Sequence, residues 1–385
     1  MVKKRLNFTA DPWLFGICGT LVFLGVIMLA SVSASFSLER YGTTFYFLNH
    51  QILFGLLPGL LLGGILFFLP RETIRALSIP AFLFSLFLCL MVFIPFVGIE
   101  AGGAHRWIHV GGFTFQPSEL LKLGFILYLA AWLSAKIKKS KKKPEPDSAK
   151  TKNLATSFLT AGDGSLVSFL LIMGGIGAIL IAQPDVGTLG VIWIIGGIMY
   201  FTAHTPLWHT ITLALAALGS LISLIHIAPY RLSRLAVFLD PSLDPLGQGY
   251  HVKQALIGIG SGGIVGAGLG LSAQKFGLLP EPMSDSIFAV IAEETGFIGA
   301  CFLVLLFAAL CWRVMVLAQR MEDRFAKIAC IGIVSWLCVQ AFINMGAITG
   351  ILPLTGIPLP FVSYGGSALL TEILGLGILL NLTKR

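Results

Sequence analysis

Long apolar runs separated by short polar connections dominate the hydrophobic pattern of this chain. A helix needs about 20 consecutive, mostly apolar residues to cross the hydrocarbon core of a bilayer. Runs of this kind predict ten transmembrane helices, at residues 13–34, 48–69, 76–97, 117–135, 165–182, 186–203, 208–227, 286–312, 326–349 and 364–382. The fifth and sixth are separated only by the short break Gln183-Pro184-Asp185.

Composition supports this interpretation. Of the 385 residues, 56% are hydrophobic and only 11% are charged, and the mean hydropathy is +0.90. A soluble domain has roughly a quarter of its residues charged. The predicted fold class is therefore an all-α polytopic membrane protein, with residues 1–385 forming one integral membrane domain.

The distribution of Lys and Arg predicts the orientation in the membrane, because cytoplasmic loops carry an excess of both. One side of the predicted topology carries both chain ends and a Lys-rich loop at 136–160. The other side has few basic residues and holds a large loop at 228–285, between the seventh and eighth spans. Both termini are thus predicted to be cytoplasmic, and the loop at 228–285 extracytoplasmic. The Lys-rich loop is interpreted as a topology signal, with contact to anionic lipid as an additional role.

Other features exclude several classes of function. The net charge of +8 comes from loop residues rather than from one basic face, so we expect no nucleic-acid partner. The six cysteines lie in apolar stretches without metal-ligand spacing, which predicts neither a disulfide nor a cysteine metal site. The basic start of the chain leads into a run long enough to span, without a signal-peptide cleavage site. Gly258-x-Gly260-x-x-Gly263 lacks the strand and helix of a dinucleotide site, and these glycines are expected to permit close backbone packing.

The informative polar residues gather on the predicted outer side. They form five groups: Gly103–Glu119, Gln183–Thr188, Arg231–Gly249, Lys275–Asp285 and Asn344–Ser367. Charged residues near apolar spans are costly and commonly functional. Five distant stretches on one side of a helical bundle predict one shared site.

Asp285 stands immediately before the eighth predicted span. Ser284-Asp285-Ser286 is also a good helix N-cap sequence, so a capping role and a functional role remain open at this stage. Glu293 and Glu294 lie about 12 Å further along the same helix at 1.5 Å per residue. As neighbours they point in different directions, which favours a buried polar network over an acid–base pair.

In Q-P-S-E-L-L-K, Glu119 and Lys122 are three residues apart and can pair on one helix face, which predicts a structural ion pair. Arg106 is the better candidate to bind an anionic ligand. Asp185 lies in a helix break that a reverse turn with a capping aspartate would also explain.

The motifs together resemble the SEDS family (shape, elongation, division and sporulation), over nearly the whole chain and in the same order. They include G-A-H-R-W-I, Q-P-S-E-L-L-K, Q-P-D-V-G-T, L-D-P-x-x-D-P-L-G-Q-G-Y, Q-K-x-G-L-L-P-E, S-D-S-I-F-A-V-I-A-E-E-T-G and G-I-P-L-P-F-V-S-Y-G-G-S. The G-L-G-L-S-A-Q-K and Q-P-D-V-G-T stretches are more similar to the division branch than to the elongation branch.

The resemblance implies ten spans and a peptidoglycan glycosyltransferase that polymerises lipid II at the outer face of the bacterial cytoplasmic membrane. By motif, the catalytic aspartate of the family falls on Asp285, and its intramembrane Glu–Lys pair falls on Glu119 and Lys122. The family usually has Phe after the aspartate, whereas this chain has Ser286. That departure puts the cavity wall in doubt, but not the carboxylate.

The implied reaction needs a base for the attacking sugar hydroxyl and cations for the departing pyrophosphate. Asp285 is the predicted base, and Arg106 and Lys275 are the predicted cations. Further substrate-binding candidates are Glu281, Gln183, Asp185, Ser363 and Tyr364. No cofactor is required by the sequence, and a divalent cation is a possible helper whose ligands the sequence does not define.

A lipid II flippase is the alternative function, because ten helices with intramembrane charges suit transport as well. A transporter should present polar groups on both faces, whereas here they gather on one. A scaffold without chemistry leaves Asp285 unexplained. The resemblance also implies a class B penicillin-binding transpeptidase and divisome membrane proteins as partners.

Overall fold

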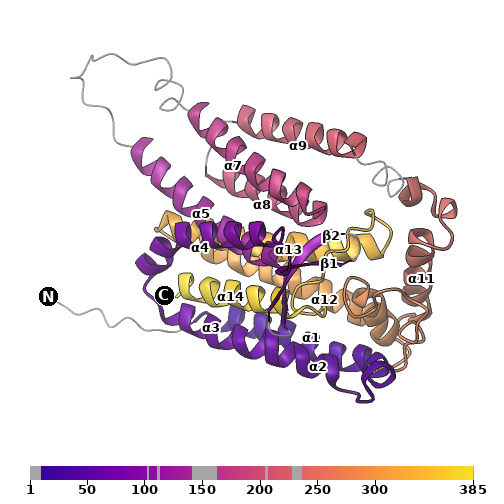
Figure 1. Ribbon diagram of the computed structural model, residues 1–385. Coiled ribbons are helices and arrows are strands. Elements are labelled where there is room, and N and C mark those ends of the chain that lie inside the picture. The colour runs from indigo at the N-terminus through magenta and orange to yellow at the C-terminus, as the bar shows by residue number, and fades with distance from the viewer. Residues whose placement is uncertain are drawn as a thin grey trace, which may run out of the picture. The chain divides into compact units, whose positions relative to one another are not determined.

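The computed structural model describes residues 10–101, 104–110, 113–140, 163–203, 207–227 and 236–384 (Figure 1). The α-helices are α1 Pro12–Tyr41, α2 Tyr46–Gln51, α3 Leu57–Phe68, α4 Arg71–Met91, α5 Pro117–Ser140, α7 Asp163–Ala182, α8 Val186–Thr202, α9 Leu207–Ile227, α11 Gln248–Ser261, α12 Ile287–Gln319, α13 Arg324–Ile348 and α14 Gly366–Leu382. Two other helical turns are the π-helix η1 Ile52–Leu56 and the 3₁₀ helix η2 Pro241–Leu243. The strands are β1 Gly98–Ala101, β2 Ala104–Val110 and β3 Phe113–Phe115.

The chain divides into two compact units. One comprises Met1–Ile74 and Leu218–Arg385, and the other comprises Arg75–Ala217. Each is described by itself below. Most of the predicted Lys-rich loop and the start of the predicted outer loop, at 228–235, lie outside the described residues.

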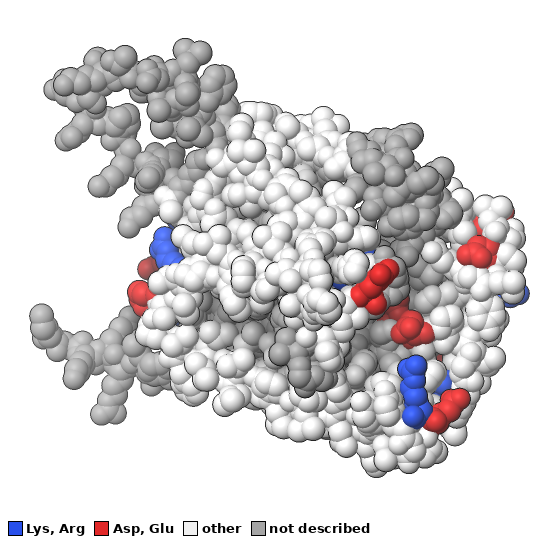
Figure 2. All heavy atoms as spheres, viewed as in Figure 1, with Lys and Arg blue, Asp and Glu red and all other residues white. Residues whose placement is uncertain are grey.

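Six helical segments among the described residues are long and apolar enough to cross a membrane. They are Pro12–Tyr41, Tyr46–Phe68, Arg71–Met91, Pro117–Ala135, Ile287–Gln319 and Arg324–Ile348. Shorter apolar helices occur at Leu166–Ala182, Val186–Thr202 and Gly366–Leu382, at positions of predicted spans. On the face drawn in Figure 2, charged side chains are sparse. The chain is therefore a polytopic membrane protein, and the count of ten spans stays a prediction.

The second predicted span is continuous from Tyr46 to Phe68 but changes its helical winding. The π-helical turn η1 lies immediately before α3, which has Pro58 in its first turn. Proline has no backbone N–H and disturbs the regular bonding of the preceding turn, which accounts for the wider turn at this point.

Glycines allow α3 and α14 to pack closely, and the two helices run side by side (Figure 1). A Cβ atom on Gly377 would lie only 2.3 Å from the carbonyl oxygen of Gly63. At the end of α3, the Asn381 side-chain amide donates to the carbonyl oxygens of Leu66 and Phe67, at 2.8 and 2.7 Å. Small residues commonly permit such close approach of membrane helices.

The α12 helix is interrupted at Gly296, where φ is 68° and ψ is −168°. Only glycine adopts this backbone region readily. The interruption lets the glycine-rich loop bond to the helix backbone: the Ala267 and Gly268 N–H groups donate to the carbonyl oxygens of Glu293 and Glu294, at 2.9 and 3.0 Å. Gly262 and Gly266 permit this close backbone packing, since a Cβ atom on them would lie 2.1 and 2.2 Å from carbonyl oxygens of α12. The prediction of close packing was wrong for Gly260 and Gly263, which have open space around their Cβ positions.

The all-α prediction was wrong for residues 98–115, which contain a three-stranded antiparallel sheet of order β1-β2-β3. In the register Ile99 pairs with Trp107, and His109 pairs with Thr114. The signal was present in the sequence, because two Gly-Gly pairs flank an alternating segment in A-G-G-A-H-R-W-I-H-V-G-G-F-T-F. The predicted outer loop likewise contains a 14-residue helix, α11.

Candidate active site

Asp285 lies in the turn segment immediately before α12 and is half-buried. Its Oδ1 atom accepts a hydrogen bond from the Ser284 hydroxyl at 3.1 Å. The N-cap of α12 is Ser286, and no side chain makes a cap hydrogen bond there. The carboxylate of Asp285 is therefore not used for capping, which removes the structural explanation left open by the sequence.

The backbone of Asp285 is fixed by Asn344 near the end of α13. The Asn344 Nδ2 atom donates to the Asp285 carbonyl oxygen at 2.7 Å and to the Ile357 carbonyl oxygen at 2.8 Å. Asn344 is only 2% exposed, so solvent does not compete for these bonds. One side chain thus ties the aspartate segment to the loop that follows α13.

That loop, residues 353–365, approaches the carboxylate directly. Gly356 has a φ of +68°, and a Cβ atom built on it would lie 3.8 Å from Asp285 Oδ2. A larger side chain at this position would project toward the carboxylate. Glycine permits the backbone turn and leaves this space beside Oδ2 free.

Ser363 and Tyr364, both predicted to bind substrate, make contacts that hold the aspartate segment. The Ser363 hydroxyl donates to the Ser284 carbonyl oxygen, and the Tyr364 N–H donates to the Met283 carbonyl oxygen at 2.8 Å. The Tyr364 hydroxyl is hydrogen-bonded to His50 Nδ1 at 3.0 Å.

The electrostatic surroundings favour a proton-accepting carboxylate. Burial raises the pKa of Asp285 above its ordinary value, while nearby His251 lowers it and Glu281 raises it further. Glu281 is exposed, and its Oε2 atom lies 3.0 Å from the Ser284 hydroxyl oxygen, so the two carboxylates share the single hydrogen of this hydroxyl. A carboxylate with a raised pKa is a stronger base once ionised, as general-base catalysis requires.

His251 lies near Asp285 and was missed by the motif analysis, which noted Ser286 only as a departure from the family. His251 Nε2 lies 2.5 Å from the Ser286 hydroxyl oxygen, and that hydroxyl donates to the Pro280 carbonyl oxygen at 2.9 Å. His251 belongs to α11, which packs against α12. Local spacing gave no signal for the pair, because its members are 35 positions apart in the chain.

Lys275 is not the free cation that the sequence predicts. Its ammonium group lies 3.2 Å from Glu294 Oε1 and donates to the Gly270 carbonyl oxygen at 2.5 Å. Glu294 also accepts bonds from the Ser31 hydroxyl at 2.9 Å. Lys275 is 4% exposed and Glu294 is 1% exposed. The ammonium is therefore committed to a buried ion pair.

Glu293 binds the backbone of the same loop. Its carboxylate accepts a hydrogen bond from the Ser272 hydroxyl and from the Ala273 and Gln274 N–H groups, the latter two at 3.0 and 3.4 Å. Together, Glu293 and Glu294 form the buried polar network predicted for them, and this network fixes the segment between α11 and Asp285.

In the other unit, Arg106 from β2 lies against the break between α7 and α8. Its Nε atom donates to the Gln183 carbonyl oxygen at 3.2 Å, and its guanidinium also donates to the Pro184 carbonyl oxygen. Within the described part of the chain, no carboxylate lies within ion-pair distance of Arg106. The Gln183 side chain is buried and donates to the Cys89 carbonyl oxygen at 2.7 Å.

Asp185 is the N-cap residue of α8, with its Oδ1 atom accepting from the Thr188 N–H at 3.3 Å. Its Oδ2 atom accepts from the Ser118 hydroxyl at 2.9 Å and from Gln116 Nε2 at 3.4 Å. Asp185 is buried, and both of its carboxylate oxygens have partners. This carboxylate joins α8 to the start of α5.

Glu119 and Lys122 form an ion pair within α5. Lys122 Nζ donates to Glu119 Oε1 at 2.9 Å, and both side chains are almost completely buried. The pair has the i,i+3 spacing that the sequence indicates. Lys122 is thereby neutralised inside an apolar helix.

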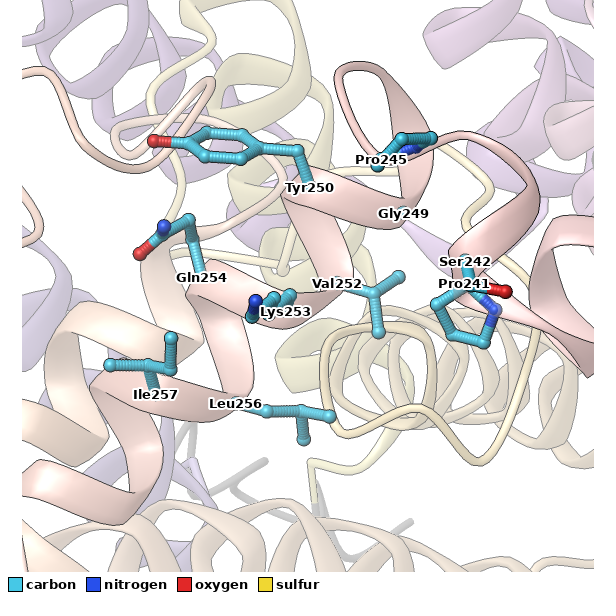
Figure 3. Close-up of a pocket in the computed structure, with 10 residues that line it drawn as sticks. All are labelled: Pro241, Ser242, Pro245, Gly249, Tyr250, Val252, Lys253, Gln254, Leu256 and Ile257. Atoms are coloured by element: carbon cyan, nitrogen blue, oxygen red, sulfur yellow. The ribbon is translucent and has the colours of Figure 1, made fainter.

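A cavity of about 650 Å³ lies beside α11, and Figure 3 draws the residues that line it. Its lining is mostly apolar, with Val252, Leu256 and Ile257 from α11 and Pro241 from η2. Lys253 is the charged residue among those that line it. The buried side of α11 carries Ala255 and Gly258.

No group of three or more His, Cys, Asp or Glu side chains is placed to hold a metal ion in the part of the chain that the structure describes. The role of a divalent cation as a helper stays an expectation.

These features define a class: a polytopic membrane protein with a half-buried carboxylate immediately before a long apolar helix. The family model of the FtsW/RodA/SpoVE cell cycle proteins matches residues 12–385. The chain belongs to this family.

Two relatives illustrate the similarity. Stage V sporulation protein E of Bacillus subtilis (strain 168) is 37% identical over 367 residues, covering 94% of each chain. The probable peptidoglycan glycosyltransferase FtsW of Geobacter sp. (strain M18) is 36% identical over 365 residues, covering 95% of this chain and 94% of the relative.

Solved structures agree with this membership. A chain from the structure described as "Structural coordination of polymerization and crosslinking by a peptidoglycan synthase complex" matches with a TM-score of 0.74 and 29% identity, covering 97% of this chain and 98% of that chain. The rod shape determining protein RodA of Thermus thermophilus matches with a TM-score of 0.65 and 26% identity, covering 97% of each. The fold is thus RodA-like.

Proposed function

We propose that this protein is a peptidoglycan glycosyltransferase that polymerises lipid II at the outer face of the bacterial cytoplasmic membrane. The proposal is supported by family membership and by FtsW relatives that carry this activity in their names. The observation that carries it is Asp285: a half-buried carboxylate, fixed by its neighbours and free of a capping role.

In the proposed reaction, the 4-hydroxyl of one sugar attacks the anomeric carbon of another, which departs from its polyprenyl pyrophosphate. Asp285 accepts the proton of the attacking hydroxyl as the new glycosidic bond forms. An α-linked donor gives a β-linked product in a single displacement, so one carboxylate suffices. The raised pKa of Asp285 suits this role.

The departing pyrophosphate needs positive charge. Arg106 is the protein cation proposed for this role, since no carboxylate pairs with it among the described residues. Lys275 is assigned instead to the buried ion pair with Glu294. The described residues do not form a metal site by themselves, so no step of the reaction is assigned to a divalent cation.

The remaining substrate candidates differ in exposure. Glu281 is exposed beside Asp285 and is proposed to contact the sugar or peptide of the substrate. Ser363 and Tyr364 are proposed to act by holding the aspartate segment. In the other unit, Gln183 and Asp185 are proposed to shape the α7–α8 break against which Arg106 rests.

A partner transpeptidase of the penicillin-binding class B type is proposed because a structural neighbour comes from a peptidoglycan synthase complex. The FtsW and sporulation relatives favour the division branch of the family, and divisome membrane proteins are therefore the expected wider partners. Both termini are proposed to be cytoplasmic.

The direct test is polymerisation of purified lipid II by the detergent-solubilised protein, with and without the transpeptidase. Wild type should give glycan ladders, and Asp285→Asn should give none while binding lipid II and melting as a folded protein. Glu322→Gln, which alters an exposed carboxylate away from the site, is the matched control. Ladders from Asp285→Asn would remove the base assignment. No ladders from folded wild type with its partner, together with transbilayer movement of lipid II in vesicles, would favour the flippase.

A further inference from the structure

His251 and Ser286 form a hydrogen-bonded pair beside the candidate base. Ser286 follows Asp285 in the chain and is completely buried, and its hydroxyl oxygen lies 2.5 Å from His251 Nε2. The same hydroxyl donates to the Pro280 carbonyl oxygen at 2.9 Å. The His251 side chain, from α11, is thereby bonded to the segment that carries the Asp285 carboxylate.

Counting hydrogens assigns the imidazole tautomer. A hydroxyl group donates one hydrogen bond, and a carbonyl oxygen only accepts. Both contacts of Ser286 are hydrogen bonds at the same time only if its hydroxyl donates to Pro280 and His251 Nε2 carries a hydrogen that it donates to Ser286. In the neutral ring, Nδ1 is then the atom that can accept a proton. Protonation makes the ring a cation without breaking the bond to Ser286.

The charges around this imidazole are few. Asp285 and Glu281 are the carboxylates that act on it. On its own helix, Lys253 is exposed. The other segment that reaches the carboxylate, residues 344–363 from α13 and the following loop, contains no charged residue. Among the described residues of α11, the segment 280–286 and residues 344–363, His251 is therefore the half-buried group beside Asp285 that can become cationic.

We infer that His251, anchored through Ser286, is a positioning residue that keeps Asp285 ionised and able to accept a proton. This inference rests on the proposed function, since it assigns a role within that reaction. The proton of the acceptor hydroxyl still moves to the Asp285 carboxylate, and the imidazole does not receive it in the bond-forming step.

The physical basis is the opposition of two effects. Burial raises the pKa of Asp285 and thus favours its neutral, inactive form, while His251 lowers it. Burial lowers the pKa of His251, and the two carboxylates raise it. Removing the imidazole takes away the largest of the effects that oppose the burial of Asp285, and leaves only its hydrogen bonds with the backbone and with Ser284 to oppose it.

The test is the pH profile of kcat/KM for lipid II polymerisation by the full-length protein with its transpeptidase. His251→Gln retains an amide donor for Ser286 but cannot be protonated. Its acid limb should move to higher pH by about half to one unit, a roughly three- to tenfold loss at low pH with little change at high pH. Ser286→Ala should shift the limb in the same direction by less. His109→Gln, an exposed histidine in β2, is the matched control.

An unmoved acid limb in both variants would overturn the inference, as would an equal loss of activity at every pH, because loss of structure alone has that effect. If one variant fails to melt as a folded protein, the profile of the other decides. Folded wild type that makes no glycan at any pH would overturn the proposed function and this inference with it. A wild-type profile with an acid limb and unshifted variants would overturn the inference alone.

Discussion

Replacing Lys275 by methionine measures how much the buried ion pair with Glu294 contributes to the stability of the protein. The two charges are 3.2 Å apart, and both side chains are almost completely buried. At an effective dielectric constant of about 20, two unit charges at this distance attract by roughly 5 kcal/mol before the cost of removing them from water. In Lys275→Met, the Glu294 carboxylate keeps only the Ser31 hydroxyl among the partners described for it.

Breaking one side of a buried pair typically costs about 3–5 kcal/mol, because the remaining charge is uncompensated. Lys275→Met should therefore lower the unfolding midpoint clearly, measured by thermal or SDS titration in one detergent. Lys253→Met removes an exposed lysine from α11 and should change stability by no more than about 0.5 kcal/mol.

The double variant Lys275→Met/Glu294→Gln tests whether Lys275 is needed for stability alone or also for binding the substrate. Removing both charges is often close to neutral for stability, and the glutamine can still accept a bond from Ser31. We expect the double variant to recover both stability and lipid II polymerisation. A stable but inactive double variant would show that Lys275 supplies charge to the substrate. A single variant as stable as Lys253→Met would refute the buried-pair reasoning.

Three further predictions concern the site and its support. Asp285→Asn should raise the unfolding midpoint at neutral pH, because burial raises the pKa of the native carboxyl and ionising it costs stability. The gain should shrink as the pH falls through the native pKa and vanish below the pKa of the unfolded chain, which a pH series of melting curves measures. Gly296→Ala should lower the free energy of unfolding by about 3 kcal/mol or more, because φ is +68° and the new Cβ atom would meet the loop backbone. Gly64→Ala, at a position on α3 with open space around it, should not destabilise the protein, and melting curves of the two variants in parallel measure the difference. Asn344→Ala should lower the free energy of unfolding by about 1–3 kcal/mol, because two buried carbonyl oxygens lose their hydrogen-bond donor. It should also lower kcat more than it raises KM, because the segment that carries Asp285 loosens, and steady-state kinetics over a range of lipid II concentrations measures this.

Features that depend on neighbours along the chain were predictable. The apolar runs correspond to the helices, since membrane helices need about 20 apolar residues. The Glu119–Lys122 pair follows from helical spacing alone. The small sheet at 98–115 was also readable from its glycine pairs and alternation, and was missed because short strands give a weak signal beside long helices.

Contacts between distant residues were not predictable in the same way. Lys275 and Glu294 are 19 positions apart, and His251 and Ser286 are 35 apart. Their pairing depends on how the glycine-rich loop returns along α12 at the Gly296 interruption. The sequence therefore predicted a cation at Lys275 but not its partner.

The chain's residues alone specified a polytopic membrane protein, because hydrophobicity and short-range spacing are local properties. They left a capping role and a functional role open for Asp285, and the family resemblance favoured the functional one. Folding in three dimensions established which polar groups are already satisfied. Lys275 and Asp185 are committed to buried partners, whereas the Asp285 carboxylate is held through its backbone and through Ser284. Burial and hydrogen bonding across the fold, rather than residue type, distinguish a structural charge from a reactive one.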